Sequence, residues 1–128
     1  MEVIKDNRSE IQFLYLKGRL DDEGVRFMED SLVKLIDDGA RQLVIDCSQI
    51  EHINNAGLRV LLNIARRIMD VEGRVAFHSP SQQVKDIFDQ TGFSLVSRIY
   101  DTREEAIAGI AGSGLLSASR DDRRLVSR

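Results

Sequence analysis

The spacing of apolar residues along the chain predicts an alternation of strands and helices. Apolar residues form short continuous or alternating runs, as strands do, in five segments: 1–10, 11–18, 42–47, 74–78 and 93–100. They recur at intervals of three and four, as along one face of a helix, in four others: 21–39, 54–70, 81–92 and 101–110. This order predicts an α/β fold with a mostly parallel central sheet of about five strands, an N-terminal antiparallel hairpin and four helices.

The helix predicted after position 54 carries a long apolar face, which we expect to pack against the sheet. Its members are Leu58, Leu61, Leu62, Ala65, Ile68 and Met69. The third strand is expected to end near Cys47, followed by a short loop that leads into this helix. Cys47 lies in an apolar run and is the chain's single cysteine, so it is interpreted as a core residue that forms no internal disulfide.

The composition changes after residue 110. The segment 111–128 is rich in Gly, Ser and Arg and has a net charge of +2, from four arginines and two aspartates. We interpret residues 1–110 as one domain and 111–128 as a flexible tail. A short docking helix built on Leu115, Leu116, Leu125 and Val126 is the alternative for the tail.

Composition and charge exclude several classes of function. The 128 residues carry a net charge of −3, and aromatic residues make up 5% with no Trp, which argues against nucleic-acid binding. No run approaches the roughly 20 apolar residues of a membrane span, and the first ten residues contain no apolar signal segment. We therefore expect a cytoplasmic protein without a bound metal or cofactor.

The stretch EHINNAGLRVLL, residues 51–62, places two asparagines between a buried strand and an apolar helix. Asn is a favoured N-cap, and Asn54 is expected to accept a hydrogen bond from the amide of Ala56 or Gly57. The small residues that follow would let a partner approach the positive end of the helix. From the residues alone, a simple cap and a functional surface explain the pattern equally well.

Two histidines are candidates for an enzymatic or metal site. His52 and His78 fall near strand ends, and Asp46, Ser48 and Ser79 are close to them in the predicted fold. A Ser-His-Asp set or a two-histidine metal site would need such residues, but none of the local sequence signatures of those sites is present. Nucleotide-binding glycine motifs are also absent from the sequence. The chain is therefore predicted not to be an enzyme.

Four motifs together resemble the STAS domain of bacterial anti-sigma factor antagonists, over roughly residues 3–110. They are Gly18-Arg19-Leu20-Asp21, Asp46-Cys47-Ser48, Asn54 to Leu58, and Gly73-Arg74-Val75. The resemblance implies a STAS fold and a protein that acts by binding other proteins. In that family, an anti-sigma factor that is also a serine kinase binds the unphosphorylated antagonist and releases the sigma factor.

The sequence departs from this family at the start of the helix. Family members usually open the helix with Asp-Ser-Ser-Gly or Asp-Ser-Thr-Gly, and the first Ser or Thr after the Asp accepts phosphate. Here Asn54 stands in the Asp position, Asn55 in the phosphoacceptor position and Ala56 in that of the second Ser. Asn has no hydroxyl, so the resemblance implies that the usual phosphorylation switch is missing at Asn55.

Two functions follow from the resemblance. The first is a non-catalytic regulator that binds an anti-sigma factor with serine-kinase activity, fixed in its binding form or regulated elsewhere. The second is a scaffold subunit of a larger complex, such as a stressosome-like particle or a lipid-transport complex, with other STAS proteins as partners. Monomer and dimer both remain open. The expected partner-binding residues are Arg19, Asp21, Asp46, Ser48, Asn54, Asn55, Ala56, Gly57, Leu58 and Arg59.

Overall fold

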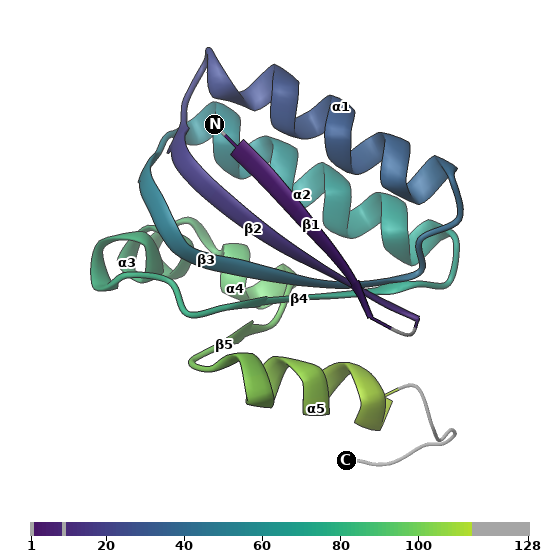
Figure 1. The fold of residues 1–128 in the computed structure, drawn as a ribbon. Coiled ribbons are helices and arrows are strands. Elements are labelled where there is room, and N and C mark those ends of the chain that lie inside the picture. Colours follow the sequence, from purple (N-terminus) through teal and green to yellow (C-terminus); the bar gives the residue numbers. More distant parts are fainter. Residues whose placement is uncertain (1, 9, 114–128) are drawn as a thin grey trace.

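The structure is a computed structural model that describes residues 2–8 and 10–113 (Figure 1). Its strands are β1 (Glu2–Arg8), β2 (Ile11–Leu20), β3 (Gln42–Ile53), β4 (Arg74–His78) and β5 (Ile99–Tyr100). Its helices are α1 (Gly24–Asp37), α2 (Asn55–Asp70), α3 (Gln82–Thr91), α4 (Phe93–Val96) and α5 (Arg103–Ser113).

The strands form one sheet in the order β1-β2-β3-β4-β5. β1 and β2 make the antiparallel hairpin, and every later neighbour is parallel. Helices α1 and α2 lie on one face of the sheet and α5 lies on the other (Figure 1). This confirms the predicted α/β fold, although the described residues contain one helix more than the four expected.

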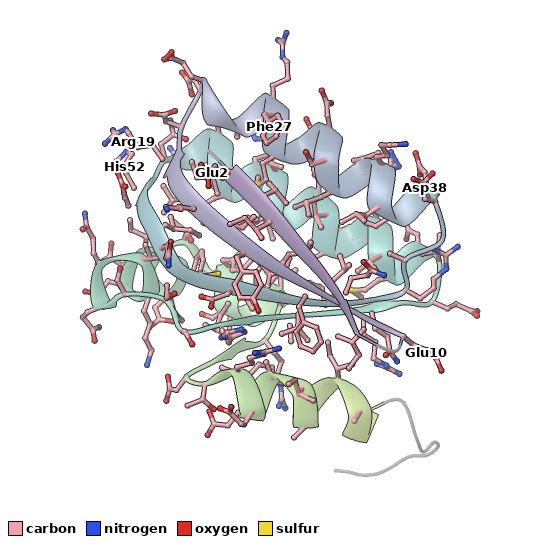
Figure 2. The ribbon with its side chains drawn as sticks, viewed as in Figure 1. Glu2, Glu10, Arg19, Phe27, Asp38 and His52 are labelled. Atoms are coloured by element: carbon pink, nitrogen blue, oxygen red, sulfur yellow. The ribbon has the colours of Figure 1, made fainter. Side chains whose placement is uncertain are left out.

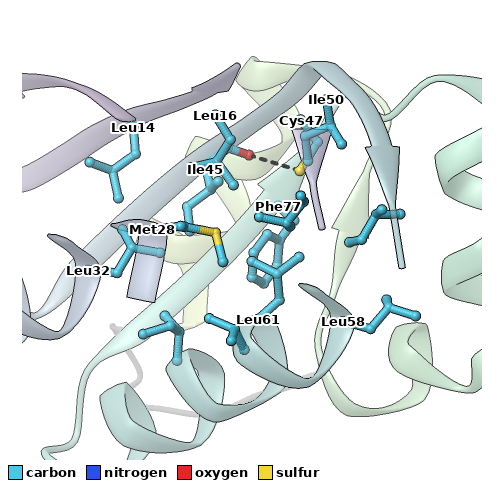
Figure 3. Close-up of a cluster of buried hydrophobic side chains, with 14 of the residues drawn as sticks. Leu14, Leu16, Met28, Leu32, Ile45, Cys47, Ile50, Leu58, Leu61 and Phe77 are labelled. Carbon is cyan, nitrogen blue, oxygen red and sulfur yellow. Dashed lines mark hydrogen bonds between the residues drawn. The ribbon is translucent and has the colours of Figure 1, made fainter. Parts of the chain in front are cut away.

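Alternation along the strands divides the buried residues between the two faces of the sheet. In β2, Leu14 and Leu16 point toward α1 and α2, where they join Met28 and Leu61 in the main core (Figure 3). Phe13 points to the opposite face and belongs to a smaller cluster with residues of β3, β4 and α5. Cys47 lies in the main core as expected, and burial raises the pKa of its thiol.

The prediction of a strand over residues 93–100 is wrong for the first four residues. These residues form the short helix α4, and only Ile99 and Tyr100 pair with β4. Gly92, with a φ of 80°, turns the chain into α4. Phe93 then packs inward, with its ring 4.7 Å from that of Phe88.

Two further expectations fail. β3 does not end near Cys47 but continues to Ile53, so no loop precedes α2. Met69 was assigned to the core but is 61% exposed. Ile68 takes the inward position in the last turn of α2, and the next residue is rotated by about 100° toward solvent.

The predicted tail falls mainly outside the described residues. α5 continues to Ser113, three residues past the proposed domain boundary, and residues 114–128 are not described. Within the described part of the chain, no helix has the length and apolar character needed to cross a membrane.

Candidate protein-binding surface at the start of helix α2

Strand β3 carries the chain to the candidate site. Its pairing with β4 ends where Asp46 lies opposite His78, but its pairing with β2 continues until Ile53 lies opposite Leu20. Two register shifts interrupt this second half of β3, and β3 contains one residue more than β2 at each. Bulges of this kind increase the local twist of a strand. Figure 1 shows β3 curving away from β4 toward the start of α2.

Asn54 is the N-cap of α2, as predicted. Its backbone is extended, with φ −111° and ψ −175°, and its Oδ1 accepts a hydrogen bond from the Gly57 amide at 3.0 Å. Its own amide donates to the Leu20 carbonyl at 3.2 Å. The end of β2 therefore fixes the residue that starts the helix.

The loop between β2 and α1 lies against the same cap. The Asn54 side-chain Nδ2 donates to Asp22 Oδ1 at 3.1 Å. Asp21 Oδ1 accepts hydrogen bonds from the amides of Glu23 at 3.2 Å and Gly24 at 3.3 Å, so Asp21 caps the start of α1. The starts of α1 and α2 are thus held together by side chains of one loop and one cap.

An exposed ion pair borders this loop. Arg19 Nε lies 3.1 Å from Asp21 Oδ2. The hydrogen bond from Arg19, together with those from the Gly24 and Glu23 amides, lowers the pKa of Asp21. Asp21 is therefore negatively charged at neutral pH. In Figure 2, Arg19 and His52, which are register partners on β2 and β3, lie together at this edge of the sheet.

Gly57 and Leu58 do not belong to the exposed surface. Both are buried, and a Cβ atom on Gly57 would lie 2.5 Å from the Leu20 carbonyl oxygen. The absence of a side chain at Gly57 therefore lets α2 approach β2 closely. Gly57 therefore has a packing role and does not make room for a partner as expected. Ala56 is half-buried.

The predicted site residues separate into two groups. Asp46 and Ser48 lie in the middle of β3, where Asp46 Oδ1 accepts a hydrogen bond from the Ser48 amide at 2.8 Å. Asp46 pairs with Tyr15 and Ile53 pairs with Leu20, so five residue steps of β2, about 17 Å at about 3.3 Å per residue, separate Asp46 from the end of β3. The residues that come together at the start of α2, here called the α2-start surface, are Arg19, Asp21, Asp22, Asn54, Asn55, Ala56 and Arg59.

The structure separates the two histidines considered for a catalytic or metal site. His78 lies at the end of β4, opposite Asp46 of β3, whereas His52 lies near the end of β3, opposite Arg19 of β2. His78 is buried, and its Nδ1 lies 2.7 Å from Ser79 Oγ. Burial lowers the pKa of His78, so it is neutral at pH 7. The Asp46 carboxylate is hydrogen-bonded to the Ser48 amide. Among residues 2–8 and 10–113, no group of three or more His, Cys, Asp or Glu side chains is placed to hold a metal ion.

Sequence reasoning missed Asp22. The predicted site includes Asp21 but not Asp22, whose carboxylate accepts a hydrogen bond from a residue 32 positions later in the chain. No local pattern reports such a contact, because it depends on the parallel pairing of β2 and β3. Two adjacent carboxylates, of which one is sufficient to cap α1, are the only signal in the sequence.

Comparison with known proteins agrees with this architecture. The family model described as the STAS domain matches residues 2–106. BtrV of Bordetella bronchiseptica, named as a candidate anti-sigma factor antagonist, is 27% identical over 108 residues, which cover 84% of this chain and 93% of BtrV.

Solved structures share the fold at lower identity. A candidate anti-sigma factor antagonist of Thermotoga maritima superimposes with a TM-score of 0.81 at 22% identity, over 85% of this chain and 94% of that one. The antagonist SpoIIAA in its unphosphorylated form gives 0.73 at 22% identity, over 87% and 97%. The family match spans most of the described residues, and the chain therefore belongs to the STAS domain family.

Proposed function

We propose that the protein is an anti-sigma factor antagonist that binds an anti-sigma factor with serine-kinase activity through the α2-start surface. We further propose that Asn55 makes it insensitive to phosphorylation at that position. The proposal assigns it a binding role without catalysis, in the cytoplasm, where sigma factors act. BtrV, its relative, carries a name of the same kind.

The observation that supports the proposal is the exposed, neutral asparagine at position 55. Asn55 is the first residue of α2, is exposed, and follows directly on the capping residue. Its side chain is neutral and has no hydroxyl, whereas a phosphorylated serine would add a charge of about −1.5 to −2 at pH 7. Asn55 therefore gives the surface the charge of an unphosphorylated antagonist at all times.

The titratable groups of the fold support a binding role. His78 is buried and neutral, and its Nδ1 is engaged with the neighbouring Ser79 hydroxyl. A general base must reach the proton that it removes from a substrate. A buried imidazole in this position is a structural group, whereas the exposed groups of the α2-start surface can contact a partner protein.

The test is the affinity of purified anti-sigma factors of the source organism for wild type, Asn55→Asp and Asn63→Asp, measured by isothermal titration calorimetry. Asn55→Asp adds a negative charge to the proposed surface, and we expect binding to weaken about tenfold or more. Its fold should be retained, because an acidic residue in the first turn of a helix is favourable.

Asn63→Asp is the matched control. Asn63 is exposed on the same helix, two turns further along, so the same change of charge is made outside the α2-start surface. We expect its affinity to equal that of wild type. If no anti-sigma factor binds wild type, or if both aspartate variants bind as tightly as wild type, the proposal is wrong.

A further inference from the structure

The side-chain amide of Asn54 both accepts and donates a hydrogen bond. The carbonyl oxygen accepts from the Gly57 amide at 3.0 Å, and the amide nitrogen donates to Asp22 Oδ1 at 3.1 Å. A carboxylate at position 54 would keep the first bond but has no proton for the second. It would also place two negative charges at hydrogen-bond distance.

We infer that Asp22 is a positioning residue for the partner-binding surface and that it acts through Asn54. The inference rests on the proposed function, because it concerns the same surface. Asp22 holds the β2–α1 loop against the cap of α2, and the loop and the start of α2 then form one surface for the partner. The amide at position 54 is the chemical group that this arrangement requires.

The loop is fixed at its other end as well. Asp21 accepts from two amides at the start of α1, and Arg19 at the end of β2 pairs with Asp21. The Asp22–Asn54 hydrogen bond joins this loop to the N-cap of α2. Breaking it frees the loop from α2, so that the hydrogen bonds from the Glu23 and Gly24 amides to Asp21 in this loop open more often. A capping oxygen remains at position 54.

The same contact explains a departure of this sequence from the family pattern. The resemblance assigns an Asp to position 54, and this chain has Asn there. An Asp at that position would face Asp22 as a like charge, whereas Asn54 faces it as a donor. The two residues are therefore a matched pair in this chain, and either one alone is insufficient.

The experiment is an exchange of the two side chains. Four proteins are compared: wild type, Asn54→Asp, Asp22→Asn, and the double variant that carries both changes. The double variant restores a donor–acceptor pair with reversed direction, keeps a capping oxygen at position 54 and has the net charge of wild type. Asn63→Asp controls for the addition of one negative charge to α2.

Two readouts are taken from each protein. The first is hydrogen exchange of the Glu23 and Gly24 amides, which reports whether the loop is held. The second is the affinity for the anti-sigma factor that binds wild type. We expect faster exchange and about tenfold weaker binding for Asn54→Asp, as for the loss of a hydrogen bond to a charged group. The double variant should recover most of both effects.

The outcomes separate the inference from the proposed function. If the double variant exchanges and binds no better than Asn54→Asp, or if Asn54→Asp behaves as wild type, Asp22 is not a positioning residue. If exchange is rescued but affinity does not follow it, the contact is structural only and the inference is overturned. If no anti-sigma factor binds wild type, the proposed function fails, whatever the exchange rates show.

Discussion

At the scale of single residues, the start of α2 depends on two kinds of contact. Asn54 supplies hydrogen bonds, and Gly57 supplies the absence of a side chain. The capping bond of Asn54 to the Gly57 amide was predicted from the sequence, because asparagine is a known capping residue and its capping partner lies two or three residues away. The second was not, because the atoms that exclude a Cβ at Gly57 belong to Leu20, on another element.

Replacing Gly57 with alanine should destabilise the protein by about 1–3 kcal/mol, the range for overpacking a close contact. The new methyl group would meet the Leu20 carbonyl and side chain, which are both buried against it. Urea unfolding of Gly57→Ala measures the cost, and Asn55→Ala, at an exposed position, is the control. Equal stability of Gly57→Ala and wild type would show that α2 does not pack so closely on β2.

Removing the cap should cost about 0.5–2 kcal/mol. Asn54→Ala leaves the Gly57 amide without its acceptor and also removes the bond to Asp22. Ser81→Ala, which removes the equivalent cap of α3, is a useful comparison because Ser81 Oγ accepts one amide, from Val84 at 3.3 Å. Thermal unfolding should rank Asn54→Ala as the less stable of the two, and the reverse order would contradict the role given to Asn54.

At the scale of elements, the hydrophobic pattern was sufficient for β1 to β4 and for the three long helices that begin before residue 93. It failed for 93–100, where a run of apolar and small residues suits either a strand or a short buried helix. In the structure residues 93–96 form α4, in which Phe93 packs against the rings of Phe77 and Phe88 and Leu95 is exposed. The length of β3 also escaped prediction, because its polar second half is held by pairing with β2.

A pair of alanine variants tests the α4 assignment. A strand would place Phe93 and Leu95 on the same face, whereas a helix separates them. Phe93 is buried and Leu95 is 91% exposed. Phe93→Ala should therefore cost about 3–5 kcal/mol, and Leu95→Ala should change stability by less than about 0.5 kcal/mol. Similar large losses from both, measured by urea unfolding, would support the strand instead.

At the scale of the whole molecule, stability should depend on pH through His78. Burial lowers the pKa of this histidine, and the groups that face it are Asp46 from β3 and Arg103 and Glu104 from α5. Below about pH 6.5, the ordinary value, the unfolded chain binds a proton that the folded chain does not. Stability is therefore lost as pH falls from about 6.5 toward the lowered pKa.

Urea unfolding at pH 7.5 and at pH 5.5 measures this dependence. We expect wild type to be less stable at pH 5.5, and His78→Gln to lose less between the two pH values because it removes the titrating group. The variant has its own packing cost, so the comparison is between the two pH differences. An equal decrease in both proteins would assign the pH dependence to other groups.

The composition of the α2-start surface depends on how β2, β3 and α2 are arranged as well as on the residue types. The resemblance to the STAS domain implies that Arg19, Asp21 and Asn54 share a site, and the structure brings these residues together at the end of β2 and the start of α2. The sequence did not indicate that Asp46 and Ser48 lie elsewhere, because that depends on the extra length of β3. The α2-start surface therefore contains fewer residues than the predicted set.

The most direct test of the central claim compares binding before and after exposure to kinase and ATP. Wild type and Asn55→Ser are each titrated with the anti-sigma factor kinase, with and without prior incubation with ATP, and intact mass records any phosphate added. We predict that wild type binds with the same affinity in both cases, whereas Asn55→Ser gains a phosphate and loses affinity. Loss of wild-type affinity after incubation with ATP would contradict an antagonist fixed in its binding form by Asn55.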